Sequence, residues 1–122
     1  MVAISSTSGV DTLPPARPNS YAAFKAAVIQ HAPSLGHALA PQGIRVNTVS
    51  PGPIFFEGGP WDLRMQSDPE GTVAIRDRIT IGRFGTPTDV ANAVTFLASP
   101  AAGFLTGDNL VVDGGFTSRV QF

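Results

Sequence analysis

Apolar residues along the chain follow two patterns, short β-branched runs and longer stretches with helical spacing. Short apolar runs at 1–6, 44–49 and 109–112 predict buried strands. Between them, apolar positions that step by three or four residues predict helices over 19–40 and 86–100. This alternation predicts an α/β fold with three parallel strands, crossover helices and both sheet faces covered.

The ends of the two predicted helices carry the residues that usually start and stop helices. A proline inside the first helix predicts a kink near residues 29–36, because proline lacks an amide hydrogen and presses on the carbonyl four residues earlier. In the second helix, a capping box and a proline in the first turn predict a well-defined start. The residues concerned are Asn19 or Ser20 as the first cap, Pro33 at the kink with Gly36 beside it, Gly43 as a left-handed stop, and Thr86, Pro87 and Asp89 at the second start.

Residues 52–82 form the least regular part of the chain, with only a weakly helical stretch over 69–79. They follow the carboxyl end of a strand, and ligands of open α/β sheets bind beyond these ends. We therefore expect 52–82 to form a substrate lid. Whether its apolar side chains line a substrate pocket or pack onto the core is left open for Phe55, Phe56, Trp61, Leu63 and Met65.

Length and charge exclude several classes of function. The chain has 122 residues, 43% of them hydrophobic, which suits one domain with a real core. Eight basic and nine acidic residues leave no basic surface for nucleic acid or an anionic membrane. No apolar run approaches the roughly 18 residues of a membrane span, and the first residues lack a signal-peptide pattern. We expect a soluble cytoplasmic protein.

Metal binding is not expected. The chain has no cysteine, so thiolate metal sites and disulfides are excluded. The only histidines, His31 and His37, have no acidic cluster nearby and are expected to be solvated. Other polar residues also have structural readings: Asn47 as a hydrogen-bonding residue of the fold, and Asp113 as the start of a tight turn.

Tyr21 and Lys25 form the first candidate for chemistry, because residues four apart lie on one face of a helix. A nearby cation favours the phenolate, so such a tyrosine can act as a general acid and base near neutral pH. Ser6, or less favourably Ser5, ends the preceding strand and could hydrogen-bond the oxygen of a carbonyl or alcohol. Taken alone, the pair is also compatible with a half-buried tyrosine beside a solvated lysine.

An ordered set of stretches resembles the short-chain dehydrogenase/reductase family, from its fifth strand to its C-terminus. The match covers nearly the whole chain, and the set as a whole is highly specific. The stretches are ISSTSG, YAAFKAAV, GIRVNTVSPGPI, RFGTPTDVANAVTFLAS and FLTGDNLVVDGG.

The resemblance implies an NAD(P)-dependent oxidoreductase that interconverts a ketone and an alcohol by hydride transfer. Tyr21 would be the catalytic acid/base, Lys25 would ease the loss of its proton and hold the nicotinamide ribose, and Ser6 would orient the substrate. Ser6 is preferred to Ser5 because Ser6 and Gly9 match the family's Ser-x-x-Gly. The turn beside the nicotinamide would contain Pro51, Gly52 and Ile54, with the backbone of Ile54 at the carboxamide.

The chain departs from the family pattern at two places. Phe56 stands where the family often carries a threonine after the Pro-Gly turn. The glycine-rich turn that receives the pyrophosphate at a helix N-terminus does not occur in the sequence, and neither does the family's Asn-Asn-Ala-Gly segment. Residues 1–122 therefore resemble a single incomplete Rossmann domain, the C-terminal part of a doubly wound parallel sheet without its cofactor-binding half.

This incompleteness leads to two functional expectations. The chain is either part of an enzyme, inactive in isolation and completed by its N-terminal half, or a non-catalytic remnant that folds or associates with other subunits. The free edge of the strand at 1–6 would offer unpaired amides and carbonyls to a partner. By analogy with the family a homo-oligomer is expected. The sequence specifies neither the substrate nor the choice of NAD or NADP.

Overall fold

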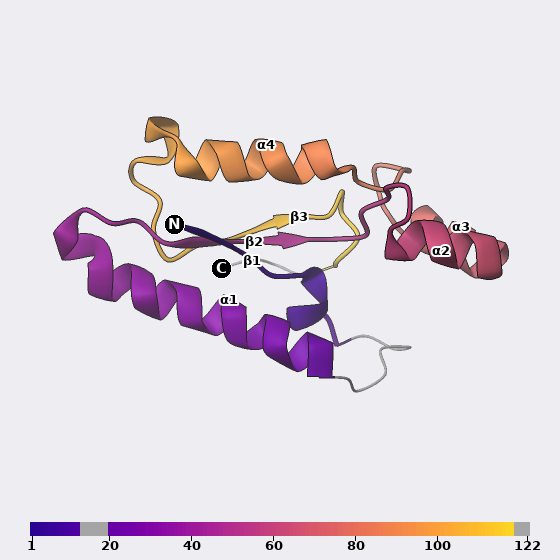
Figure 1. Ribbon diagram of the computed structural model, residues 1–122, viewed down its shortest axis with the longest axis horizontal. Helices are drawn as coiled ribbons and strands as arrows, with labels where there is room; N and C mark the ends of the chain where they lie inside the picture. Colours follow the sequence, from indigo (N-terminus) through magenta and orange to yellow (C-terminus); the bar gives the residue numbers. More distant parts are fainter. Residues whose placement is uncertain (13–19, 119–122) are drawn as a thin grey trace.

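A three-stranded parallel sheet lies between two long helices in the computed structural model, which describes residues 1–12 and 20–118. Helix α1 runs along one face of the sheet and helix α4 along the other (Figure 1). The strands lie in the order β1-β2-β3, and Val49 of the central strand pairs with Ile4 on one side and Leu110 on the other. The bounds are β1 Val2–Ile4, α1 Ser20–Leu39, β2 Asn47–Pro51, α4 Pro87–Ala98 and β3 Asn109–Val112.

The remaining helices are short. Two α-helices project beyond the carboxyl ends of the strands (Figure 1), and three single 3₁₀ turns join the larger elements. The α-helices are α2 Pro60–Ser67 and α3 Pro69–Asp77, and the turns are η1 Thr7–Gly9, η2 Ala40–Gln42 and η3 Pro100–Ala102.

The hydrophobic core lies between the sheet and α4. Val49, Leu97 and Ala102 are buried at its centre. Apolar side chains from β1, from β3 and from one face of α4 pack around them, because residues three and four apart share one side of a helix. These surrounding residues are Val2, Val90, Ala93, Val94, Leu110 and Val112.

The predicted fold class, strand order along the chain and both long helices are confirmed. The central strand begins at Asn47 rather than Ile44, because its neighbour β1 begins only at Val2, the partner of Asn47. Helix α1 continues through Pro33, and Gly43 adopts the predicted left-handed conformation with φ of 76°. The proposed cap Asn19 lies outside the described residues.

The predicted start of the second long helix is confirmed in detail. The Thr86 hydroxyl accepts a hydrogen bond from the Asp89 amide at 3.2 Å, and the Asp89 carboxylate accepts one from the Thr86 amide at 2.7 Å. Pro87 occupies the first turn, where its missing amide hydrogen costs no helical bond.

Helix α2 lies in a stretch predicted to be irregular. Its start carries usable signals, namely Gly59 as the cap, Pro60 in the first turn and Asp62 near the helix N-terminus. With eight residues it is too short for a clear apolar period, so packing against α3 rather than intrinsic propensity accounts for it.

Gly36 marks the tightest approach of α1 to the rest of the fold. A β-carbon at this buried position would lie 3.0 Å from Thr106 Oγ1, 3.1 Å from the Gly107 amide nitrogen and 3.1 Å from the Val46 carbonyl oxygen. Two of these atoms belong to the backbone, which cannot rotate away. The glycine therefore lets α1 sit close to the segments that precede β2 and β3.

We expect Gly36→Ala to destabilise the chain by about 1 kcal/mol, because overpacking by roughly 1–3 kcal/mol outweighs a gain of about 1 kcal/mol in helix propensity. Urea denaturation measures the change. The exposed Ala38 of the same helix provides the control, since Ala38→Gly should lose about 1 kcal/mol through propensity alone. A more stable Gly36→Ala variant would contradict the proposed close packing.

Candidate active site

The carboxyl end of β1 is tied to the first turns of α1 by two hydrogen bonds. The hydroxyl of Ser5 donates to the Lys25 carbonyl oxygen at 2.7 Å, and the Lys25 ammonium donates to the Ile4 carbonyl oxygen at 3.1 Å. Ser5 is buried, with 3% of its surface exposed, and its hydroxyl hydrogen is used in this bond. Ser5 thus serves the fold, which leaves Ser6 as the candidate of the two serines.

Gly9 brings the turn after β1 directly against the helix backbone. A β-carbon there would lie 2.8 Å from the Ala26 nitrogen and 2.8 Å from the Lys25 carbonyl carbon. Within the same turn, the Ser6 hydroxyl accepts a hydrogen bond from the Ser8 amide at 3.1 Å. The absence of a side chain at residue 9 therefore allows the turn that holds Ser6 to pack beside the start of α1.

Tyr21 and Lys25 meet on one face of α1 as the sequence predicts. The Lys25 ammonium lies 5.6 Å from the centre of the Tyr21 ring, within the range of a cation–π contact. Tyr21 is 55% exposed, whereas Lys25 is half-buried and held by its bond to the Ile4 carbonyl. A held cation thus lies beside an accessible phenol ring.

One open cavity of about 370 Å³ brings Tyr21, Ser6 and Trp61 together at the carboxyl edge of the sheet. Its lining combines hydroxyl groups with apolar rings and contains no charged side chain. The lining residues are Ser6, Thr7, Ser8, Tyr21, Gly52, Pro53, Pro60, Trp61 and Phe116.

Two residues of the predicted cofactor turn lie outside this cavity. Pro51 is the last residue of β2 and pairs with Val112 of β3. The side chain of Ile54 lines a separate, smaller cavity of about 100 Å³, where it packs against Gly85. Among the turn residues, Gly52 alone borders the cavity with Tyr21.

Of the five apolar lid residues for which two readings were open, Trp61 alone borders the cavity. Phe55 instead stacks on Phe84, with ring centres 5.8 Å apart. Phe56 is 46% exposed and its ring covers Gly59, while Met65 is half-buried on α2 outside the cavity lining. The two readings left open for this segment therefore divide by residue: Trp61 borders the cavity, and Phe55 packs on Phe84. The other three lie outside the cavity lining, and two of them, Phe56 and Leu63, are exposed.

Sequence reasoning missed several lining residues. Pro53 and Pro60 belong to the lid segment, and Phe116 reaches the cavity from beyond β3. Phe116 follows the Asp-Gly-Gly turn, and its ring lies 4.6 Å from the guanidinium of Arg78. No local pattern marks this phenylalanine as a cavity residue, since it lies 95 residues from Tyr21 in the chain.

The turn that begins at Asp113, directly after β3, packs closely against Gly52. A β-carbon on Gly52 would lie 2.6 Å from the Asp113 β-carbon, so the glycine is required by packing. Burial of Asp113 disfavours its charged form, but hydrogen bonds from Thr117 and Gly115 outweigh burial and lower the pKa of the carboxyl. The structural reading of Asp113 as a tight turn is therefore confirmed.

Asn47 has the structural role that the sequence indicates. It is buried, its side-chain amide donates to the Leu105 carbonyl at 2.9 Å, and its side-chain oxygen accepts from the Asp108 amide at 3.0 Å. Both polar ends are thus occupied in joining β2 to the segment before β3. His31 and His37 are exposed, as expected.

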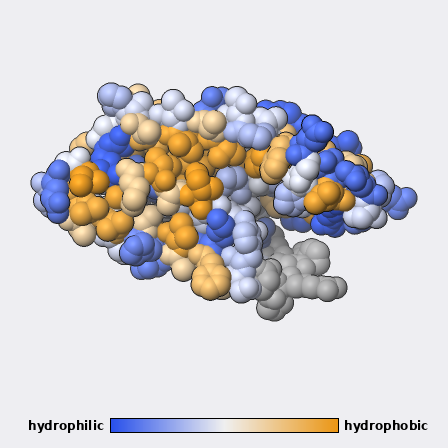
Figure 2. Space-filling model, viewed as in Figure 1, coloured by the Kyte–Doolittle hydropathy of each residue, from blue (hydrophilic) through white to orange (hydrophobic). Residues whose placement is uncertain are grey.

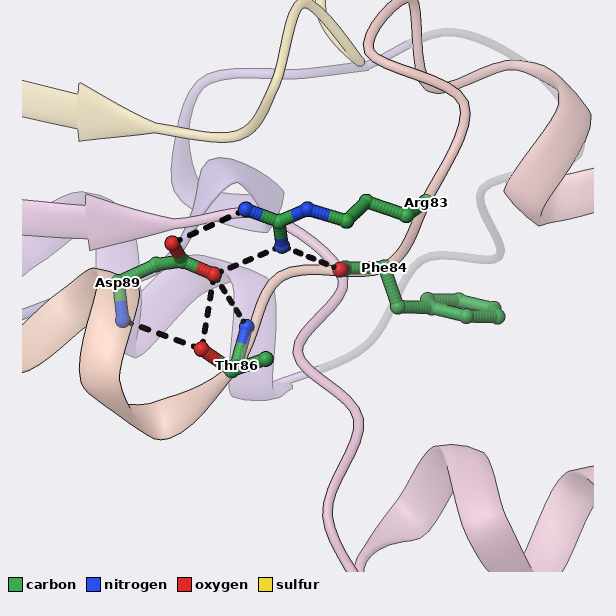
Figure 3. Close-up of polar contacts among 4 residues, drawn as sticks. All are labelled: Arg83, Phe84, Thr86 and Asp89. Carbon is green, nitrogen blue, oxygen red and sulfur yellow. Dashed lines mark hydrogen bonds and ion pairs between the residues drawn. The ribbon is translucent and has the colours of Figure 1, made fainter.

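A cluster of polar contacts anchors the segment behind the lid (Figure 3). Arg83 donates to the Asp89 carboxylate at 2.8 and 3.1 Å and to the Phe84 carbonyl oxygen at 2.9 Å. The same carboxylate accepts hydrogen bonds from the amide and the hydroxyl of Thr86. The bond from Arg83 and those from Thr86 hold the pKa of Asp89 well below its usual range.

The residues present fit one end of a nicotinamide cofactor. The bridge between Ile54 and Gly85 uses the Pro53 carbonyl and the Phe55 amide, so the amide and carbonyl of Ile54 itself point away from Gly85. Neither group takes part in this bridge, so both would be available to a carboxamide. No glycine-rich turn occurs in the sequence to bind the pyrophosphate end.

Residues 1–12 and 20–118 contain no cluster of three or more potential metal ligands. No helix within these residues has the length and apolar character needed to cross a membrane.

Comparison with known proteins agrees with the geometry. Residues 1–117 match the family described as enoyl-(acyl carrier protein) reductase. Over 105 residues the chain is 49% identical to isoepoxydon dehydrogenase of Penicillium expansum, a match that covers 86% of this chain and 40% of the relative. The chain belongs to the short-chain dehydrogenase/reductase family.

Two solved structures of short-chain oxidoreductases share the fold. An NAD⁺-bound dehydrogenase of Leptospira borgpetersenii superposes with a TM-score of 0.79 at 35% identity, covering 96% of this chain and 44% of that one. An NADPH-bound oxidoreductase of Pseudomonas aeruginosa gives 0.82 at 31% identity, covering 98% and 46%. The chain thus spans less than half the length of these relatives and corresponds to their C-terminal part.

The Asp89 cluster predicts a pH dependence of stability. The folded state lowers the pKa of Asp89, so its stabilising contribution is present above the unfolded value of about 3.9 and is lost as the pH falls below it. We expect Asp89→Asn to flatten the fall in urea midpoint between about pH 5 and pH 2. Asp77→Asn is the control, since that exposed carboxylate caps no helix. Equal slopes for Asp89→Asn and the unmodified chain would refute the role of this carboxylate.

Proposed function

We propose that this chain supplies the catalytic part of an NAD(P)-dependent oxidoreductase that interconverts a ketone and a secondary alcohol. The observation that supports it most strongly is the shared cavity of Tyr21 and Ser6, with the Lys25 ammonium 5.6 Å from the phenol ring. The bound cofactor would supply the hydride. Its nicotinamide end would be held by Tyr21, Lys25, Gly52 and the backbone of Ile54.

The chain's own residues account for the proton. Reduction of a carbonyl adds a hydride to carbon and a proton to oxygen, and the hydroxyl of Tyr21, which borders the cavity, would donate this proton. Ser6 already accepts a bond from the Ser8 amide, and its hydroxyl hydrogen can be donated to the same substrate oxygen. In the reverse direction the phenolate takes the proton from the alcohol.

The isolated chain is proposed to lack turnover. Its sequence offers no glycine-rich turn for the pyrophosphate, so cofactor affinity would rest on the nicotinamide end alone. Activity is expected when the N-terminal part of a family member is supplied. The choice between NAD and NADP stays open, because both cofactors occur in the related structures.

We expect Tyr21→Phe to lower kcat by about 10²- to 10⁴-fold in the complemented enzyme, because the variant removes only the proton donor. Turnover is followed by NADH and NADPH oxidation with cyclohexanone, and cofactor binding by titration. Ser34→Ala, an exposed hydroxyl on the same helix, should leave turnover unchanged. Full activity in the Tyr21→Phe enzyme would overturn the role of Tyr21.

A second candidate function is that of a non-catalytic subunit that only associates with a partner. Both candidate functions require a surface on which a partner can dock. Apolar side chains gather across the face between α4 and α1 (Figure 2). A groove of about 470 Å³ lies there between β1 and α1. Its lining is almost wholly apolar: Met1, Ala3, Phe24, Ala27, Val28, His31, Ala32 and Leu35.

The chain as a whole exposes more surface than a compact monomer of its mass. The chain exposes 7589 Å², whereas a compact monomer of 12.7 kDa would expose roughly 6,200 Å². The excess of roughly 1,400 Å² exceeds the roughly 800 Å² that each partner of a stable interface buries. Within the described residues β1 pairs only with β2, so its other edge can accept a strand. We propose that the N-terminal half of a family member occupies this groove.

We expect Phe24→Ser to weaken this association at least tenfold, because Phe24 is 73% exposed in the groove and its burial on binding would be lost. The test mixes the chain with the N-terminal half of the Penicillium expansum relative and measures complex mass by light scattering. Phe104→Ser, outside the groove and fully exposed, should bind normally. Self-association of the chain through the groove, or equal binding by both variants, would contradict the proposal. A complex without turnover would favour the non-catalytic subunit.

A further inference from the structure

The apolar part of the cavity wall is formed by rings, among them the indole of Trp61. Trp61 is the second residue of α2, and its ring borders the cavity that Tyr21 also borders. Away from the polar residues, the wall contains rings and no charged side chain. A flat apolar surface of this kind favours a ring-shaped ligand, because aromatic faces stack on rings. The guanidinium groups of Arg64 and Arg78 lie 5.6 Å and 4.6 Å from the rings of Trp61 and Phe116 but outside the lining, so no charged side chain of the lining itself is available to pair with a charged ligand.

Phe84 connects Trp61 to the fixed part of the fold. Its ring centre lies 5.6 Å from that of Trp61 and 5.8 Å from that of Phe55, both in tilted geometry. Phe84 does not border the cavity itself. Its influence on a ligand would therefore pass through the orientation of the Trp61 ring.

The backbone of Phe84 is held from two sides. Its carbonyl accepts a hydrogen bond from Arg83, which is also bound to Asp89 at the start of α4, and in Figure 3 the Phe84 ring points away from this polar cluster. The neighbouring Gly85 exchanges hydrogen bonds of 2.8 and 3.0 Å with the backbone of residues 53–55. The ring thus projects from a rigid support toward the lid.

We propose that Phe84 is a positioning residue for substrate selection: it fixes the Trp61 ring as a flat wall, so that the cavity takes uncharged cyclic carbonyl compounds. This rests on the proposed function in that the cavity is taken as the substrate site. It goes further in naming a substrate class and a residue outside the cavity that enforces it.

The first test uses Trp61 as its own reporter, since it is the only tryptophan of the chain. We expect Phe84→Leu to raise acrylamide quenching of its fluorescence about twofold, as one face of the indole loses its neighbour. Phe84→Tyr should restore the original quenching, because it keeps the ring. Phe96→Leu, on the exposed part of α4, should leave it unchanged. Unchanged quenching in a folded Phe84→Leu variant would overturn the proposal.

The second test measures binding without turnover, from the shift of the Trp61 indole N–H resonance. The probes are cyclohexanone, methyl butyl ketone and hexanoate, which have equal carbon number but differ in ring and charge. We expect a saturable shift with cyclohexanone, a weaker response to the open-chain ketone and none to hexanoate. Phe84→Leu should weaken cyclohexanone binding roughly threefold to tenfold, the loss expected for one aromatic pair.

The outcomes separate this proposal from the proposed function. Equal binding of hexanoate and cyclohexanone, or unchanged affinity in Phe84→Leu, would overturn the substrate class or the positioning role. Tyr21→Phe should still bind cyclohexanone, because the indole wall is intact. A Tyr21→Phe enzyme with full turnover would therefore refute the proton-transfer chemistry while leaving the Phe84 result in place.

Discussion

The site depends on the tie between the end of β1 and the first turns of α1. Two hydrogen bonds, from Ser5 to the Lys25 carbonyl and from Lys25 to the Ile4 carbonyl, join the strand to the helix. Gly9 allows the intervening turn to touch the helix backbone. Through this tie one lysine serves two purposes, since its backbone anchors the helix while its ammonium lies near the Tyr21 ring. The hydroxyls of Ser6 and Tyr21 then border one cavity as a consequence of packing.

The opposite wall of the cavity depends on the start of α4. The capping box of Thr86 and Asp89 and the ion pair to Arg83 are surface interactions, and an exposed pair of this kind contributes little to stability by itself. Their geometric effect is larger, because they fix the segment from which Phe84 reaches Trp61. A helix start far from the tyrosine can in this way decide the shape of the site.

Both faces of the sheet are covered, but one of its edges is exposed. Helices cover both faces of the sheet, yet the edge of β1 and the groove beside it remain exposed to solvent within the described residues. The chain spans less than half of the related structures, and its apolar groove lies beside β1. Tyr21 borders the cavity and is itself 55% exposed.

The sequence by itself determined the order of strands and helices, the cap of α4, the Tyr21–Lys25 pair and the family, because these rest on local periodicity and on motifs within a few residues. It could not determine helix α2, since eight residues without a clear apolar period depend on their packing partner. Nor could the sequence predict which lid residues border the cavity. Trp61 borders it while Phe55 packs on Phe84, and both contacts depend on how segments distant in the chain meet. The choice of Ser6 over Ser5 agreed with its motif, but only the tertiary structure gave the physical reason: the Ser5 hydroxyl is buried in a bond to the helix, and a buried donor that is already used cannot serve a substrate.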